Sequence, residues 1–234
     1  MHHITHHVAT IDAARYVEQY RNVPRFLAFC KQCNNYGRMW CCPPFDDDVE
    51  RLTDGYEQVT VWGTVITFDQ ATRQACNSDA QRRQLSSQAI DDAWRQLLPF
   101  LHAQEAAHPG SRLFVGLCHH CRPCQCSRVD GKPCRHPELM RPSLEAVGFD
   151  VSATARDVLG IELLWSTDGR LPQRITLLNV KLLNCDQYKG NSQRANIHIC
   201  KLSDNNSQVS AKPKLISYLK ASKDFVFLAI SPKQ

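Results

Sequence analysis

The segment between Cys118 and Pro142, CHHCRPCQCSRVDGKPCRHPELMRP, most constrains how this chain can fold, because it holds five of the 12 cysteines. Cysteines at C-x2-C spacing turn their thiolates back toward one point, as in iron–sulfur loops and zinc ribbons. We expect the segment to bind one metal centre through four thiolates, those of Cys118, Cys121, Cys124 and Cys134. Cys126 is the spare thiol, and it is an alternative to Cys124 as the third ligand.

The four thiolates suit either of two cofactors. A [4Fe–4S] cluster takes four cysteines, and its ligand runs often end near a proline, as Cys134 does before Pro137. Zinc takes four thiolates tetrahedrally at the same spacing. We expect a [4Fe–4S] cluster. Zinc stays as the alternative, because the spacing of the cysteines fixes the ligands better than it fixes the metal.

A second group of cysteines lies far upstream, in FCKQCNNYGRMWCCPPF, and consists of Cys30, Cys33, Cys41 and Cys42. We expect only one of the two adjacent cysteines to face a given centre, so this group supplies three thiolates. The fourth ligand then comes from Cys126 or a histidine, or one coordination position stays open. An open position is typical of catalytic metal sites, and a closed set is typical of structural ones.

Hydrophobic patterning predicts an α+β fold with a mixed or antiparallel sheet, helices on one face, and the cysteine loops at one end. Residues 58–68 are rich in β-branched and aromatic side chains and predict a buried strand. Apolar residues recur at helical spacing over 85–101 and predict one long helix. A short strand is expected at 112–117, and a hairpin is expected from 161–165 and 174–178.

The chain lacks the features of a membrane or secreted protein. No stretch approaches the roughly 18–20 apolar residues of a membrane helix, and the N-terminus lacks the apolar core of a secretory signal. We therefore expect a cytoplasmic protein, in which reduced thiols bind metal rather than form disulfides. Four histidines near the N-terminus are expected to be solvated at a frayed end, namely His2, His3, His6 and His7.

The use of basic residues changes near Asn179. The chain has 17 Arg and 2 Lys before this position, and 1 Arg and 8 Lys from it onward. A steady coding composition normally keeps this ratio constant, so we predict a metal-binding domain over residues 1–178. Residues 179–234 are predicted to be a Lys-, Asn- and Ser-rich extension that is appended or poorly ordered.

Three arginines in the cysteine segment, Arg122, Arg128 and Arg135, have two interpretations. Cations near a thiolate cluster balance its negative charge, and arginines also bind phosphate or nucleic acid. The formal net charge of +5 is mild for 234 residues and does not favour a nucleic-acid partner. We expect Glu145 to pair with Arg141 across one helical turn.

Three motifs occur in order: CxxCxxYGxxWxCPP from Cys30, CxxCxxC from Cys118, and CRxPxxxRPSxEAxG from Cys134. Together they resemble a prokaryotic family of unknown function whose members are described as predicted metal-binding proteins, over about residues 20–178. The resemblance implies metal binding, with iron–sulfur as the expected form, and it implies that Cys42 rather than Cys41 is a ligand. It supplies no reaction.

Three functions fit these features. The first is an iron–sulfur redox or electron-transfer module, with a redox partner protein as its expected partner. The second is a zinc-stabilised module that contacts nucleic acid or an acidic partner. The third is an enzyme with an open metal position; no phosphate loop, dinucleotide fingerprint or nucleophile triad assigns catalytic residues or a reaction to it.

Overall fold

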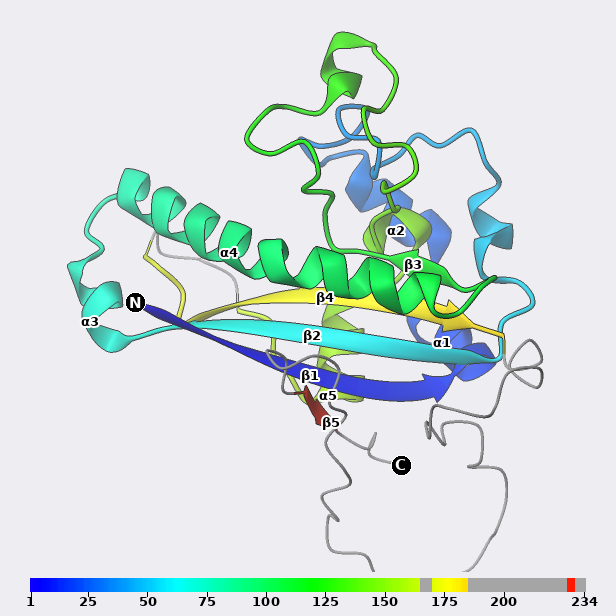
Figure 1. Ribbon diagram of the computed structural model, residues 1–234, viewed down its shortest axis with the longest axis horizontal. Helices are drawn as coiled ribbons and strands as arrows, with labels where there is room; N and C mark the ends of the chain where they lie inside the picture. Colours follow the sequence, from blue (N-terminus) through cyan, green and yellow to red (C-terminus); the bar gives the residue numbers. More distant parts are fainter. Residues whose placement is uncertain (165–169, 185–226, 230–234) are drawn as a thin grey trace, which may run out of the picture.

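The structure is a computed structural model that describes residues 1–164, 170–184 and 227–229. Its centre is a five-stranded sheet in the order β3-β4-β2-β1-β5 (Figure 1). The first four strands are antiparallel to their neighbours, and β5 runs parallel to β1, so the predicted α+β fold with a mixed sheet is confirmed. The strands are β1 (His2–Asp12), β2 (Gln58–Phe68), β3 (Arg112–Phe114), β4 (Arg174–Leu183) and β5 (Phe227–Ala229).

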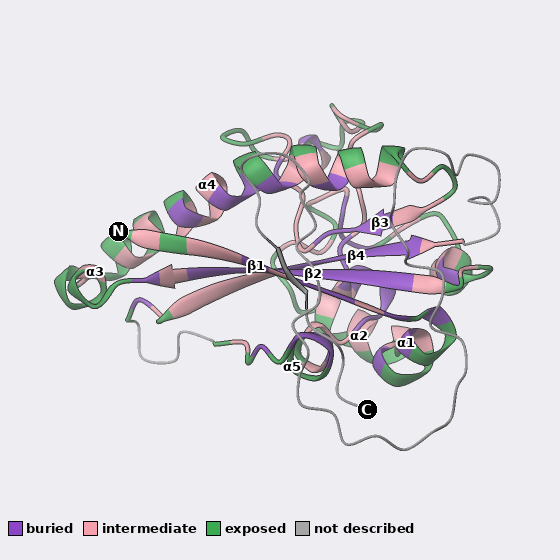
Figure 2. Ribbon diagram, turned by 60° about the horizontal axis from the view of Figure 1, so that its bottom comes forward, coloured by how far each residue is buried: buried purple, intermediate pink, exposed green. Residues whose placement is uncertain are grey.

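Helices cover both faces of this sheet, whereas we expected them on one face. Figure 2 shows α4 on one side of the sheet, with α1 and α5 on the other. The α-helices are α1 (Ala13–Tyr20), α2 (Val23–Cys30), α3 (Gln70–Ala75), α4 (Asp79–Ala106) and α5 (Val151–Leu159). Three short 3-10 helices join them, η1 (Val49–Thr53), η2 (Ser127–Asp130) and η3 (Glu145–Val147).

The central strand β2 explains why two helical layers are needed. Successive side chains of a strand point to opposite faces, and in β2 both sets are largely apolar and buried. Val61 is fully buried in the core cluster under α1 and α5. Trp62 is buried in the cluster that contains Trp94 and Leu97 of α4. A strand that is apolar on both faces requires cover on both faces, and one helical layer would leave half of it in water.

The N-terminus is a strand of the sheet, so the prediction of a frayed end is wrong. β1 pairs with β2 along its whole length, from His2 opposite Phe68 to Asp12 opposite Gln58. His6 is buried in β1, and its Nδ1 lies 3.0 Å from the hydroxyl of a threonine on β2. Burial lowers the pKa of His6 to about 4, so this histidine is neutral near pH 7.

The predicted hairpin is also wrong. Residues 161–164 form no strand, and residues 165–169 lie outside the described residues. β4 instead pairs with β2 on one side and β3 on the other, because its apolar residues complete the cores on both faces of the sheet. β4 continues to Leu183, past the change in composition at residue 179.

Two polar residues beyond that change are buried in β4. Asn179 is fully buried, and Lys181 is 2% exposed. The Lys181 ammonium donates to the backbone carbonyl of Gln104 at 3.0 Å and lies over the Trp62 ring, 5.5 Å from its centroid. The assignment of residues 179–234 to a separate extension remains a prediction, and most of that segment lies outside the described residues.

Candidate metal centre

Helix α2 places the first cysteine motif beside η3. The backbone N–H of Asn22, which caps α2, donates to the carbonyl of Gly148 at 2.7 Å. Gly148 has φ of +95°, and a Cβ there would lie 2.6–2.9 Å from atoms of Val23, so this approach requires glycine. The last residue of α2 is Cys30, whose sulfur lies 3.8 Å from the carbonyl oxygen of Glu145.

Tight turns follow Cys30 and fold the first motif back on itself. The N–H of Cys33 donates to the carbonyl of Cys30 at 3.0 Å, and the N–H of Cys42 donates to the carbonyl of Met39 at 3.1 Å. The sulfurs of Cys41 and Cys42 lie 3.8 Å apart. Both adjacent cysteines therefore face the same region, contrary to expectation, because the backbone turns here instead of continuing as an extended strand with alternating sides.

The second cysteine segment is a long loop whose two ends are fastened together. The N–H of Val115, just after β3, donates to the carbonyl of Pro142 at 3.1 Å, and the N–H of Leu144 donates back to the carbonyl of Val115 at 3.0 Å. Between them, the N–H of Ser143 donates to the carbonyl of Cys41 at 2.8 Å. The base of the second loop is thus hydrogen-bonded to the first motif.

Arg128 joins the two cysteine loops further out, and Figure 1 shows these loops side by side. Its guanidinium donates to the carbonyls of Met39 at 3.0 Å, Cys42 at 2.6 Å and Pro44 at 2.6 Å. It also lies over the Trp40 ring, 4.7 Å from the ring centroid. Two motifs that are far apart in the sequence therefore form one cysteine-rich region.

Several of the predicted ligands lie close enough to influence one another's ionisation. The pKa of the Cys118 thiol is raised to about 12, mainly by burial and in part by the neighbouring thiols of Cys41, Cys121 and Cys134. Burial also raises the pKa of Cys134, with added contributions from Cys121 and Cys126. The structure thus brings together three of the four ligands predicted in the second loop, namely Cys118, Cys121 and Cys134.

Three thiols accept hydrogen bonds from the amide two residues further along the chain. The N–H of Asn35 lies 3.5 Å from the sulfur of Cys33. The amides of His120 and His136 act in the same way on Cys118 and Cys134, where they oppose the rise in pKa caused by burial. Amides directed at sulfur stabilise thiolates, the form that binds metals.

The sulfurs gather in one region without converging on a point. Within the described residues, no three histidine, cysteine, aspartate or glutamate side chains are placed so as to hold a metal ion together. Cys124 is exposed, whereas Cys126 is partly buried and influences Cys134. The side chains gathered here are cysteines, and their thiolates are suitable metal ligands. Which of them bind the metal remains a prediction.

Three arginines of the second loop make contacts within the chain. Arg141 pairs with Glu105 of α4, with atoms 2.6 Å apart, so the predicted pair between Arg141 and Glu145 is wrong. The fastened base of the loop directs Arg141 toward α4 instead. Arg135 donates to the carbonyl of Gln125 at 2.7 Å. With the three bonds of Arg128, these contacts direct the arginines toward the protein rather than toward a nucleic acid.

Histidines beside the cysteines were not singled out from the sequence. His119 is buried and stacked on Trp94, with ring centroids 5.1 Å apart, and its Nδ1 lies 3.5 Å from Asp91. Burial lowers the pKa of His119 to about 4. His120 turns the other way, toward His102 of α4, with its Nε2 3.2 Å from the Nε2 of that residue. The pair of histidines inside the CHHC motif was the available signal.

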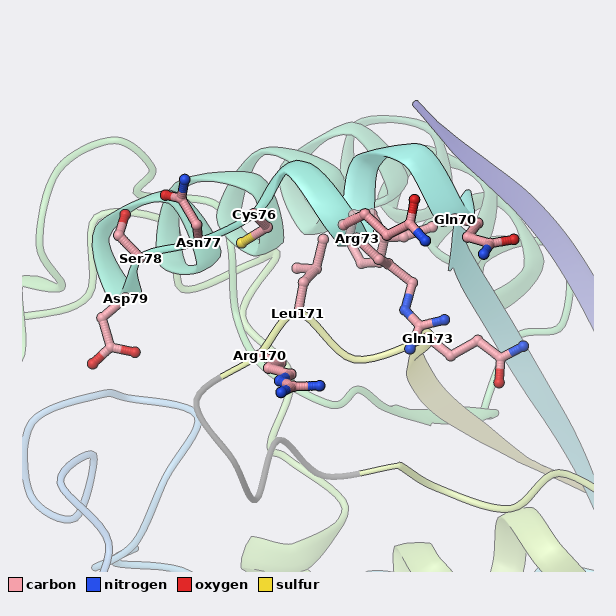
Figure 3. Close-up of a pocket in the computed structure, with 11 residues that line it drawn as sticks. Gln70, Arg73, Cys76, Asn77, Ser78, Asp79, Arg170, Leu171 and Gln173 are labelled. Atoms are coloured by element: carbon pink, nitrogen blue, oxygen red, sulfur yellow. The ribbon is translucent and has the colours of Figure 1, made fainter.

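An open pocket of about 750 Å³ lies at the other end of α4, where α3 and α4 meet (Figure 3). Arg73, Asp79 and Arg170 supply its charged side chains, and Cys76 lies on its wall. The pocket is therefore lined by a single thiol and does not share the chemistry of the cysteine loops.

Comparisons with known proteins give one match. The family model described as Predicted metal-binding protein (DUF2284) matches residues 17–182, a range that includes both cysteine motifs and ends within β4. Searches of the curated proteins and of the solved structures found no match to this chain. Among the described residues, no helix is long and apolar enough to span a membrane.

Proposed function

We propose that this chain, which belongs to the family of predicted metal-binding proteins, is a redox module that holds a [4Fe–4S] cluster on its second cysteine loop. The ligands are Cys118, Cys121 and Cys134, with Cys124 or Cys126 as the fourth. When bound, such a cluster gains or loses one electron at a potential set by hydrogen bonds, charge and solvent exposure. Cys30, Cys33 and Cys42 form a second thiolate site beside it.

The observation that carries this proposal is the local environment of Cys118 and Cys134. Each sulfur has a neighbouring thiol that raises its pKa and a backbone amide that acts in the opposite sense. In such an environment the two thiols keep their protons until a metal cation displaces them, and the amides then stabilise the resulting thiolates. Partial burial of both residues limits contact with water.

The fourth ligand is better supported as Cys126 than as Cys124. Cys126 is partly buried, and its charge affects Cys134 across the loop. It also precedes η2, in which Ser127 donates to the carbonyl of Pro133 at 2.7 Å and closes the turn. Cys124 is exposed, and water at a ligand shortens the life of a cluster.

A cytoplasmic location and a redox partner protein accompany the proposal. All ten cysteines among the described residues are free thiols, as a reducing compartment would keep them. Arg128 holds the two thiolate sites next to each other through its bonds to the first loop. Adjacent sites suit the passage of electrons from one centre to the other and on to a partner.

Zinc is the second candidate, because it takes the same thiolates. The zinc-stabilised binding module needs arginines that are available to a partner. Arg128 and Arg135 instead donate to backbone carbonyls of the chain, which favours the redox function over this one. An enzyme with an open metal position has no further support from the arrangement of side chains.

Replacing Cys121 by serine tests the proposal, with Cys76→Ser as the matched control. Cys121 lies among the proposed ligands, whereas Cys76 lies on the pocket between α3 and α4. We expect anaerobically purified Cys121→Ser to lose iron and to unfold at lower urea, because metal binding contributes to folding. The Cys76→Ser control should keep its iron and should unfold at the same urea concentration as the wild type. Equal iron content in the two variants would refute the ligand assignment.

A further inference from the structure

Three imidazoles meet where α4 faces the second cysteine loop, and the proposed redox function uses none of them. His102 lies on α4, His120 lies in the loop, and His136 lies further along the same loop. The ring centroids of His102 and His120 are 5.2 Å apart, and those of His120 and His136 are 6.1 Å apart. All three side chains are half-buried.

The nitrogens of two of these rings face each other. The Nε2 of His102 lies 3.2 Å from the Nε2 of His120. A neutral imidazole carries its proton on one nitrogen, and the hydrogen bond made by that nitrogen shows which one it is. The partners of the two Nδ1 atoms therefore determine what the facing nitrogens can do.

An acceptor lies near the second nitrogen of each ring. The Nδ1 of His102 lies 3.9 Å from the carboxylate of Glu105, which is an ion-pair distance rather than a hydrogen bond. The backbone carbonyl of Leu139 is hydrogen-bonded to the His120 ring. Because the Nε2 of His120 faces His102, the bond to Leu139 uses Nδ1. The two Nε2 atoms are within hydrogen-bond distance of each other, and when both rings carry their proton on Nδ1 the two lone pairs are directed at each other.

A metal ion between the two nitrogens would take the place of the proton that they otherwise share. Zinc–nitrogen bonds of about 2.0–2.1 Å in tetrahedral geometry place two ligand nitrogens roughly 3.3 Å apart, close to the separation observed here. Metal-bound histidines also donate their second ring N–H to a carboxylate or a backbone carbonyl, and Glu105 and Leu139 supply such acceptors beside His102 and His120. The pair matches a metal site in separation and in its nearby acceptors.

We propose that His102 and His120 bind one divalent transition-metal ion, of the zinc, cobalt or nickel class, with His136 as the third imidazole ligand. The site is distinct from the thiolate sites and goes beyond the redox function proposed for them. His102 and His120 already converge, and His136 joins them by turning its ring toward His120. Imidazole nitrogens suit this class of borderline metals.

Glu105 is the positioning residue of the proposed site. Its carboxylate is held by Arg141, with atoms 2.6 Å apart, and accepts the backbone N–H of Leu113 at 3.0 Å. These bonds fix the carboxylate against β3 and orient His102 from behind. Loss of such an orienting partner typically lowers metal affinity by about 10- to 100-fold.

The test titrates Zn²⁺ into the full chain by calorimetry, after treatment with a chelator. The starting protein carries serine at the proposed ligands of both thiolate sites, namely Cys30, Cys33, Cys42, Cys118, Cys121 and Cys134, so that both sites are removed. We expect one Zn²⁺ to bind, His120→Ala to abolish this binding, and Glu105→Gln to weaken it by about 10- to 100-fold. His3→Ala, at an exposed position of β1, is the control and should bind as the starting protein does.

Two results would overturn the proposal. One is Zn²⁺ binding that survives His120→Ala or is lost with His3→Ala, which would place the ion at the N-terminal histidines. The other is no binding by a folded starting protein. If this variant does not fold, the same titration of the reduced wild-type chain decides, because His120→Ala should then remove one equivalent and leave the cysteine-dependent binding. An unchanged number of bound Zn²⁺ ions, or a loss of the cysteine-dependent binding instead, would overturn the histidine site.

Discussion

Replacing Arg128 by methionine should separate the two cysteine loops. Methionine keeps an apolar side chain against Trp40 but cannot donate to the carbonyls of Met39, Cys42 and Pro44. Arg128 makes three bonds from the second loop to the first motif, whereas Trp40 makes one in the other direction, from its Nε1 to the carbonyl of Lys132 at 3.2 Å. Loss of Arg128 should therefore affect the fold and the thiolate region together.

The magnitude follows from the three bonds and the ring contact. Hydrogen bonds from a charged donor contribute about 1.5–3 kcal/mol each when buried, and the bond to Pro44 is exposed and contributes less. The contact with Trp40 adds about 0.5–1 kcal/mol at a partly exposed site. Allowing for side-chain entropy and non-additivity, we expect Arg128→Met to lower the free energy of unfolding by about 2–4 kcal/mol.

Urea unfolding of the reduced, chelator-treated protein measures this loss. Arg135→Met is the matched control, because Arg135 makes one exposed bond within its own loop, to Gln125. The control should lose no more than about 1 kcal/mol. Equal losses in the two variants, or a loss below about 0.5 kcal/mol for Arg128→Met, would refute the view that Arg128 joins the loops.

Three further predictions concern the core and the ligands. Gly148→Ala should cost about 3 kcal/mol in urea unfolding, because φ is +95° and the new Cβ would meet Val23; a loss under 1 kcal/mol would show that α2 can move away. Burial lowers the pKa of Lys181 from 10.5 to about 8, so the unfolded chain binds a proton between these pH values that the folded chain has released. The free energy of unfolding of the wild type, relative to that of Lys181→Met, should therefore increase as pH rises through this window. A difference that does not change with pH would contradict the lowered pKa of Lys181. Cys42→Ser should lower the metal content of the purified protein and Cys41→Ser should not; the reverse result would reassign the ligand.

The sequence predicted elements whose signals are local. The apolar run of β2 and the periodic apolar positions of α4 depend only on neighbouring residues, and both elements form where they were expected. Ser78 caps α4 by accepting the N–H of Gln81 at 3.3 Å, which is also a local signal. The strand at the N-terminus was missed because its two pairs of adjacent histidines resemble a solvated tail until β2 is placed beside them.

What the sequence could not supply is the relation between distant segments. The hairpin expected near residue 174 was wrong because β4 instead completes cores formed with β2 and β3. Spacing indicated two separate cysteine motifs, and the bonds of Arg128 that join them cross more than 80 residues. The facing nitrogens of His102 and His120 likewise require α4 to pack against the loop.

The extent of β4 also affects how the protein should be studied. A chain that ended at Leu178 would lose the half of β4 that pairs with β3 and with the first residues of β2. It would also lose Lys181 and its bond to Gln104. Measurements of metal binding should therefore use the full chain.

Iron and acid-labile sulfide analysis of the full chain, purified without oxygen, tests the central claim most directly. The redox proposal predicts a coloured protein with roughly four iron atoms and four sulfides per cluster, and loss of both when Cys118 or Cys134 is replaced by serine. A colourless protein that contains stoichiometric zinc and no sulfide would contradict it.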